Sequence, residues 1–163
     1  MQTIEEVLLT AIALERYGQE YYSRFASKIP DKKGKALMRG LGNDEKEHEE
    51  LISKHYREHF DKTPPKKIGI DIGAKAIKEI FSPKKGKSES EIMLETLQIG
   101  IVIEQKSVDF YTASAGGAKD AKLKQLLNAL IDIEKGHKAM LEESLFHLRQ
   151  DGAWWGYVPI LEG

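Results

Sequence analysis

Two copies of one pattern of potential metal ligands recur at a fixed offset along the chain. Each copy has a glutamate, a tyrosine seven residues later and then a Glu-x-x-His pair, and the offset is 89 residues, as from Glu15 to Glu104. The residues are Glu15, Tyr22, Glu45 and His48 in the first copy, and Glu104, Tyr111, Glu134 and His137 in the second. A single Glu-x-x-His is weak evidence. Two in register, each with a further matched glutamate, predict a carboxylate-bridged site for two metal ions.

Helix geometry explains why these side chains should meet. Residues three apart on a helix differ by about 60° in direction and about 4.5 Å in rise, so each Glu-x-x-His pair projects from one face. That face is also the apolar one, because the pairs continue two stripes of leucine and isoleucine. The stripes are Leu37, Leu41, Glu45, His48, Ile52 and Leu126, Leu130, Glu134, His137, Leu141. Glu15 lies on the same stripe as Ile12 and Tyr22, and Glu104 on the same stripe as Ile101 and Tyr111.

Charge balance supports the metal interpretation. Four buried glutamates without cations would be strongly destabilising, since each buried unpaired ion costs several kcal/mol. No lysine or arginine lies on these stripes near the level of the glutamates. Two divalent cations would contribute four positive charges against the four carboxylates, and two neutral imidazoles would complete the ligand set. Oxygen-rich ligation with one imidazole for each metal favours iron or manganese.

Four helices are needed to position these residues. Two capping boxes, Thr3-x-x-Glu6 and Ser88-x-x-Glu91, predict the starts of the first and third helices, and Asp31 can cap the second. The expected helices cover about residues 4–28, from after Asp31 to about His59, 89–115 with Gly116 and Gly117 as the stop, and 120–150. The matched offset of their residues indicates two related helical hairpins.

The connection between the hairpins determines the topology. Residues 61–88 form a long link rich in Lys, Pro and Gly, with a short helical piece expected around Ala74 to Phe81. Such a link lets the third helix run parallel to the second. The sequence therefore predicts an all-α four-helix bundle over residues 1–150. The tail, residues 151–163, is too aromatic to remain in water and is expected to pack on the bundle or on a second subunit.

Composition limits the classes of function. The chain has 163 residues, enough for one domain, with 31% charged residues and a net charge of −1, so no nucleic-acid partner is indicated. No apolar run approaches the roughly 20 residues of a membrane span, and the N-terminus is acidic where a signal peptide is basic. We therefore expect a cytoplasmic protein. The absence of cysteine excludes disulfides, thiolate catalysis, iron-sulfur clusters and Cys-type zinc sites.

The ligand set resembles that of rubrerythrin and its relatives, the erythrin branch of the ferritin-like superfamily. One Glu from each of two helices and Glu-x-x-His from each of the other two is the ferritin-like arrangement. The resemblance covers about residues 1–150 and implies a ferritin-like bundle with a non-haem di-iron centre. It implies the following roles: Glu45 and Glu134 bridge, Glu15 and Glu104 are terminal ligands, and His48 and His137 each bind one iron.

The resemblance also implies a function. Rubrerythrins reduce hydrogen peroxide and ferritin relatives oxidise Fe(II), so we expect a di-iron oxidoreductase of peroxidase or ferroxidase type that acts on peroxide or dioxygen. Two Fe ions are expected, with Mn or a mixed Fe/Mn pair as the alternatives. Typical rubrerythrins carry a glutamate where this chain has Ser107, and many have a Cys-ligated rubredoxin domain. Electrons must therefore come from a separate, rubredoxin-like donor protein. A homodimer is expected, with helices exchanged across the long link as one form.

Several alternatives remain open at this stage. A non-catalytic protein that stores or delivers iron is the second functional hypothesis, and a structural helical dimer with a vestigial site is the third. Tyr22 and Tyr111 either hydrogen-bond ligand carboxylates or are plain core residues. Gly136 either relieves crowding at the site or marks a helix distortion. His55 and His59 either form an entry path for metal or are simply solvated.

Overall fold

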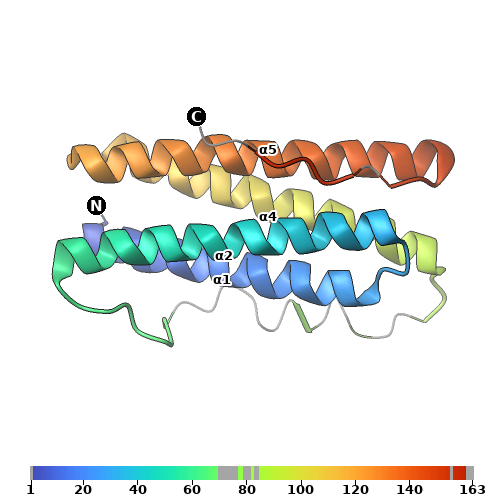
Figure 1. Ribbon diagram of the computed structural model, residues 1–163, viewed down its shortest axis with the longest axis horizontal. Helices are drawn as coiled ribbons and strands as arrows, with labels where there is room; N and C mark the ends of the chain where they lie inside the picture. The colour runs from blue at the N-terminus through green and yellow to red at the C-terminus, as the bar shows by residue number, and fades with distance from the viewer. Residues whose placement is uncertain (1, 70–76, 79–81, 83–84, 155, 161–163) are drawn as a thin grey trace.

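The computed structural model describes residues 2–69, 77, 78, 82, 85–154 and 156–160, apart from the side chain of Asp151. The four long helices are α1 (Ile4–Lys28), α2 (Lys32–Phe60), α4 (Glu89–Gly117) and α5 (Ala121–Asp151). Figure 1 shows them as two antiparallel hairpins, α1 with α2 and α4 with α5, lying side by side. The predicted all-α four-helix bundle is confirmed.

The helix ends follow the sequence signals. Both predicted capping boxes are present, and the side chain of Asp31 accepts hydrogen bonds from the backbone N–H groups of Lys33 and Gly34. Helix α5 begins after Asp120, whose side chain accepts from the N–H of Leu123. The expected end of α4 was two residues early, because the helix continues through both glycines to Gly117. Glycine weakens a helix interior by only about 1 kcal/mol, so two do not stop a packed helix.

The chain direction matches the predicted topology. Figure 1 shows α2 and α4 running the same way, with the described ends of the link at opposite ends of the bundle. Of the expected helical piece between Ala74 and Phe81, only Ile77 and Lys78 are described, and both are helical. The rest of that piece lies outside the described residues. None of the described helices combines the length and the apolar character that a bilayer crossing requires.

The core is divided into two apolar clusters with a polar level between them. One cluster gathers around Leu8, Ile52, Tyr111 and Leu127, and the other around Tyr21, Leu41, Leu97 and Leu141. Each cluster draws on all four helices. The six predicted ligands occupy the level between the clusters, where the packed apolar ends keep water away.

One predicted core residue is placed differently. Ile101 was expected on the inward stripe of Glu104, but it is only half-buried and packs at the edge of the second cluster. The inward positions one turn and two turns before Glu104 are Gly100 and Leu97, which are buried. Helix α4 has apolar residues around most of its circumference, so its sequence defines the inward stripe poorly.

Candidate metal centre

All six predicted ligands come together in the interior of the bundle. Their side chains are buried, with at most 4% of any of these residues exposed. Four helices contribute: α1 and α4 one glutamate each, and α2 and α5 a Glu-x-x-His pair each. Two overlapping groups have ligand atoms within 4.8 Å of one another and could each hold a metal ion. These groups are Glu15, Glu45, His48 and Glu134, and Glu45, Glu104, Glu134 and His137.

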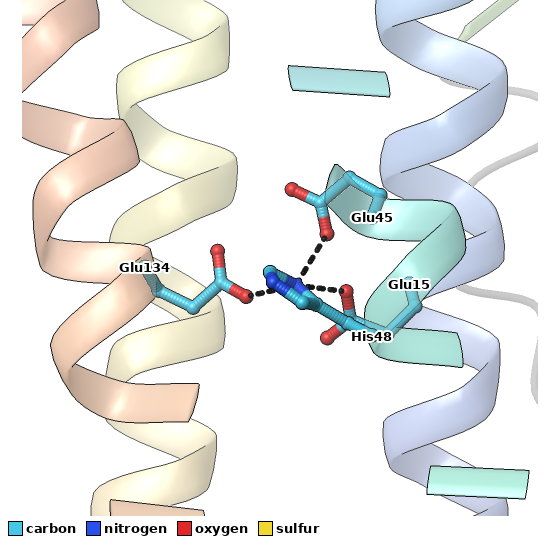
Figure 2. Close-up of side chains that lie close together, drawn as sticks. All are labelled: Glu15, Glu45, His48 and Glu134. Atoms are coloured by element: carbon cyan, nitrogen blue, oxygen red, sulfur yellow. Dashed lines mark hydrogen bonds and ion pairs between the residues drawn. The ribbon is translucent and has the colours of Figure 1, made fainter. Parts of the chain in front are cut away.

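The first group surrounds one nitrogen of His48. Figure 2 shows three carboxylates converging on this imidazole from α1, α2 and α5. The distances from His48 Nδ1 are 3.2 Å to Oε2 of Glu15, 3.3 Å to Oε1 of Glu134 and 3.6 Å to Oε2 of Glu45. One ring nitrogen carries at most one hydrogen, so it can satisfy only one of these oxygens. A cation between them would be shared by all three.

The second group repeats this arrangement around His137. The distances from His137 Nδ1 are 3.2 Å to Oε1 of Glu45, 3.2 Å to Oε2 of Glu134 and 3.9 Å to Oε2 of Glu104. The two histidine rings are nearly parallel, with their centroids 5.6 Å apart. Glu45 and Glu134 therefore each present one oxygen to each histidine, whereas Glu15 and Glu104 each serve one side.

Each of the two repeated tyrosines hydrogen-bonds a glutamate of the other hairpin. The Tyr111 hydroxyl on α4 donates a hydrogen bond to Oε1 of Glu15 on α1, and the Tyr22 hydroxyl on α1 donates to Oε1 of Glu104 on α4. Each terminal glutamate thus turns one oxygen toward a histidine and the other toward a tyrosine. Of the two alternatives for these tyrosines, the hydrogen bonds favour the first, in which each hydroxyl contacts a carboxylate of the cluster.

The carboxyl groups differ in their electrostatics. Burial and the charge of Glu45 raise the pKa of Glu15 and of Glu104 well above the ordinary value. Burial also raises the pKa of Glu45, but hydrogen bonds with Glu15 and the two histidines outweigh it, so this pKa is lowered. For Glu134, burial and the charge of Glu45 are outweighed by its histidine contacts, and the pKa is again lowered.

The histidines bind protons tightly when no cation is bound. Burial lowers the pKa of His48, but its close contacts with the carboxylates of Glu134, Glu15 and Glu45 outweigh burial and raise the pKa far above the ordinary value. Burial likewise lowers the pKa of His137, and its carboxylate contacts raise it well above that value. Two imidazolium ions, two carboxylates and two carboxylic acids then make a neutral cluster. Two divalent cations with four carboxylates and neutral imidazoles make a neutral cluster as well.

The residues present fit a pair of metal ions. Oε1 of Glu134 is buried and has no hydrogen-bond partner among the described residues, although it points at His48. A buried carboxylate oxygen without a hydrogen bond is unfavourable, and a cation would satisfy it. The donor set of four carboxylates and two imidazoles suits iron or manganese.

Two further residues belong to the site that the sequence patterns did not identify. Oδ2 of Asp44 lies 3.1 Å from Nε2 of His137, and the Tyr157 hydroxyl lies 2.9 Å from each carboxylate oxygen of Asp44. Asp44 directly precedes Glu45 and lies off the apolar stripe, so periodicity does not indicate it. Comparison of the two copies of the repeat gives a signal for Asp44. The copies differ at this position, where the second copy has the apolar Ile133.

Small residues make room around the ligands. A Cβ atom on Gly18 would lie 3.1 Å from Cγ of Glu45, so this position in α1 admits the carboxylate. Its equivalent in the repeat is Ser107, which is buried in α4. Gly136 faces the tail and not the ligands, because a Cβ there would lie 2.4 Å from Cδ1 of Ile160. Crowding at the site, the first sequence-based alternative, is therefore not what this glycine relieves. The helix is regular through this glycine.

The remaining histidines lie away from this cluster. His59 is exposed and His55 is half-buried, near the end of α2. Among the described residues neither one joins a group that could hold a metal.

Comparison with known proteins identifies the family. The rubrerythrin family model matches residues 6–145. The chain belongs to the rubrerythrin family. No match was found among curated proteins. A solved structure of a hypothetical protein from Pyrococcus furiosus is similar to this rubrerythrin family member, with a TM-score of 0.75 and 25% sequence identity over 93% of this chain and 94% of that one. The family and the buried Glu/His groups together indicate metal binding.

Proposed function

We propose that this protein is a non-haem di-iron oxidoreductase of the rubrerythrin type that reduces peroxide or dioxygen. In this proposal Glu45 and Glu134 would be shared by two iron ions. Glu15 and His48 would complete the set that holds one ion, and Glu104 and His137 the set that holds the other. The bundle over residues 1–150 is the catalytic unit, and a separate protein supplies electrons, because the chain has no cysteine to bind an electron-transfer cluster of its own.

One observation carries the proposal. Each of Glu45 and Glu134 points one oxygen at His48 and the other at His137. A carboxylate that only neutralised one protonated histidine would not need to place an oxygen near each of the two histidines. Two oxygens of one carboxylate directed at two separate imidazoles support the proposal, because a carboxylate shared by two metal ions would need this arrangement.

The side chains around the site contribute in distinct ways. Iron held here would supply electrons and act as a Lewis acid toward a small oxygen substrate. The Tyr22 and Tyr111 hydroxyls hold the terminal carboxylates in place, so that each offers a single oxygen. Burial and the charge of Glu45 raise the pKa of Glu15 and Glu104 in the metal-free cluster, so these carboxyl groups would give up protons when a cation binds. The apolar clusters on both sides exclude bulk water from the reacting centre.

Anaerobic titration with Fe(II) tests the metal assignment. We expect about two equivalents of iron for each chain, and an oxo-bridge absorption band after oxidation. Glu134→Ala should abolish binding of at least one ion, because both positions share this residue. Glu142→Ala on the same helix, an exposed residue with its side chain 52% accessible, is the matched control and should bind as the parent does. Unchanged stoichiometry in Glu134→Ala would refute the bridge.

Adding peroxide and oxygen in separate trials tests the reaction. Rapid reoxidation by peroxide with a rubredoxin-like donor present would support peroxidase activity, and rapid reaction with oxygen alone would support ferroxidase activity. The buried Ser107, in place of a glutamate typical of the family, favours a second candidate. With one carboxylate fewer than typical rubrerythrins, the protein would store or deliver iron and would react slowly with peroxide and oxygen. Slow reaction with both oxidants at full iron occupancy would favour this candidate.

A further inference from the structure

The C-terminal segment folds back onto the bundle at the level of the metal centre. Helix α5 ends at Asp151, and the capping residue Gly152 has a left-handed φ of 71° that turns the chain around. Figure 1 shows the tail running back along α5 from the end of that helix. Trp154 is buried in the second apolar cluster, and Tyr157 and Ile160 pack against the same cluster. The tail prediction is confirmed in its first form, packing on the bundle surface.

Three helix glycines make room for the tail. A Cβ atom would lie 2.5 Å from Cε2 of Trp154 if placed on Gly34, and 2.4 Å from Cδ2 of Tyr157 if placed on Gly40. Gly136 meets Ile160 in the same way. Glycine costs about 1 kcal/mol relative to alanine within a helix. Three such positions, each in contact with one tail side chain, indicate that the tail packs at a defined place on α2 and α5.

The docked tail is linked to the ligand His137 by hydrogen bonds through Tyr157 of the tail and Asp44 of α2. The Tyr157 hydroxyl lies 2.9 Å from both oxygens of Asp44, and Asp44 accepts a hydrogen bond from Nε2 of His137 at 3.1 Å. With hydrogen held on Nε2, the lone pair of a neutral imidazole is on Nδ1, the atom that faces Glu45 and Glu134. A carboxylate in this position fixes the ring orientation and makes the imidazole a stronger ligand.

Among the described residues, His48 has no counterpart of this arrangement. The repeat equates Asp44 with Ile133, a buried residue that cannot accept a hydrogen bond from a histidine. The ligand sets around His48 and His137 are otherwise the same. The difference between the two metal positions therefore comes from Asp44 and the tail residue that holds it.

We propose that the C-terminal tail is a positioning element for one of the two metal positions, with Tyr157 holding Asp44 against His137 so that the His137 position binds a divalent cation more tightly than the His48 position. The proposal rests on the two-metal site proposed above. It predicts two resolved binding steps, the tighter one at His137.

Anaerobic titration of the metal-free full chain with Co(II), followed by its visible absorption bands, tests the proposal. Asp44→Asn should weaken the tighter step by about 10–100-fold, and Tyr157→Phe by about tenfold, with the weaker step unchanged. Tyr56→Phe is the matched control. The hydroxyl of this residue also donates to a carboxylate, Oε1 of Glu5 at 2.7 Å, but neither residue belongs to the groups that could hold a metal. Circular dichroism and thermal unfolding of each metal-free variant check the fold.

The outcomes separate this proposal from the proposed function. If the parent chain binds no Co(II), the two-metal site itself is wrong. If the parent binds two ions with equal affinity, or if the Asp44 and Tyr157 variants retain both parental steps, only the positioning role is overturned. Equal weakening of both steps, together with a lower unfolding temperature, would assign the tail a purely structural role and also overturn it. Loss confined to the tighter step, with Tyr56→Phe unaffected, is the expected result.

Discussion

Loading the metal-free protein with two divalent cations should release about four protons at pH 7. Burial and the charge of Glu45 raise the pKa of Glu15 and Glu104, so each holds one proton before loading. The carboxylate contacts of His48 and His137 outweigh burial and raise the pKa of both, so each holds a second ring proton. All four groups must lose a proton to become ligands.

The proton count fixes the pH dependence of binding. The product of the two binding constants should rise by about four powers of ten for each pH unit near neutrality, because four protons leave as two cations enter. The sign follows from the raised pKa values: a lower pH keeps the protons in place and opposes the metal.

Calorimetry measures this release directly. Titrations with Co(II) in buffers of different ionisation enthalpy give a slope equal to the number of protons transferred. Glu15→Gln is the matched control, because an amide replaces a protonated carboxyl group of the same size. It should lower the count from about four to about three. A release of fewer than two protons in the parent protein would refute the protonation states derived from the burial and contacts of these groups.

Three other expectations concern stability. Gly34→Ala should displace the Trp154 ring, with a tryptophan emission shifted to longer wavelength and a loss of about 1–3 kcal/mol in urea unfolding, since the ring cannot yield as a flexible chain end can. Thr3→Ala removes the N-cap of α1 and should cost about 0.5–2 kcal/mol by the same measurement, without changing metal stoichiometry. The metal-free protein should lose stability as pH rises above about 6.5, by up to about 1.4 kcal/mol per pH unit for each of His48, His137, Glu15 and Glu104. The folded pKa of each group lies above its unfolded value, so the folded protein keeps protons that the unfolded chain has lost. A flat profile of unfolding free energy against pH would contradict this.

The sequence predicted the helices and the clustering of the six Glu and His side chains because both depend on local periodicity. Glu45 and His48 lie three residues apart on an apolar stripe, and helix geometry alone makes them neighbours. The capping boxes are likewise local, and both were found where expected.

The contacts that the sequence did not reveal depend on tertiary packing. Asp44 lies about 100° around the helix from Glu45, so it joins no stripe, and its contact with His137 exists only because α2 lies beside α5. Tyr157 reaches Asp44 only when an irregular segment docks, and no periodic signal predicts such a path. Crossing of Tyr22 to the opposite hairpin also requires the arrangement of α1 against α4.

The placement of ligands in both hairpins has a consequence for the history of the molecule. The helices of one hairpin contact each other far more than they contact the other hairpin. Each half holds only part of a metal position, so a single-hairpin ancestor would have completed the centre only as a symmetric pair. Symmetry would have forced both halves to carry the same residue at the place now occupied by Asp44 and Ile133. Joining such halves in one chain would remove that restriction, and Asp44 and Ile133 now differ.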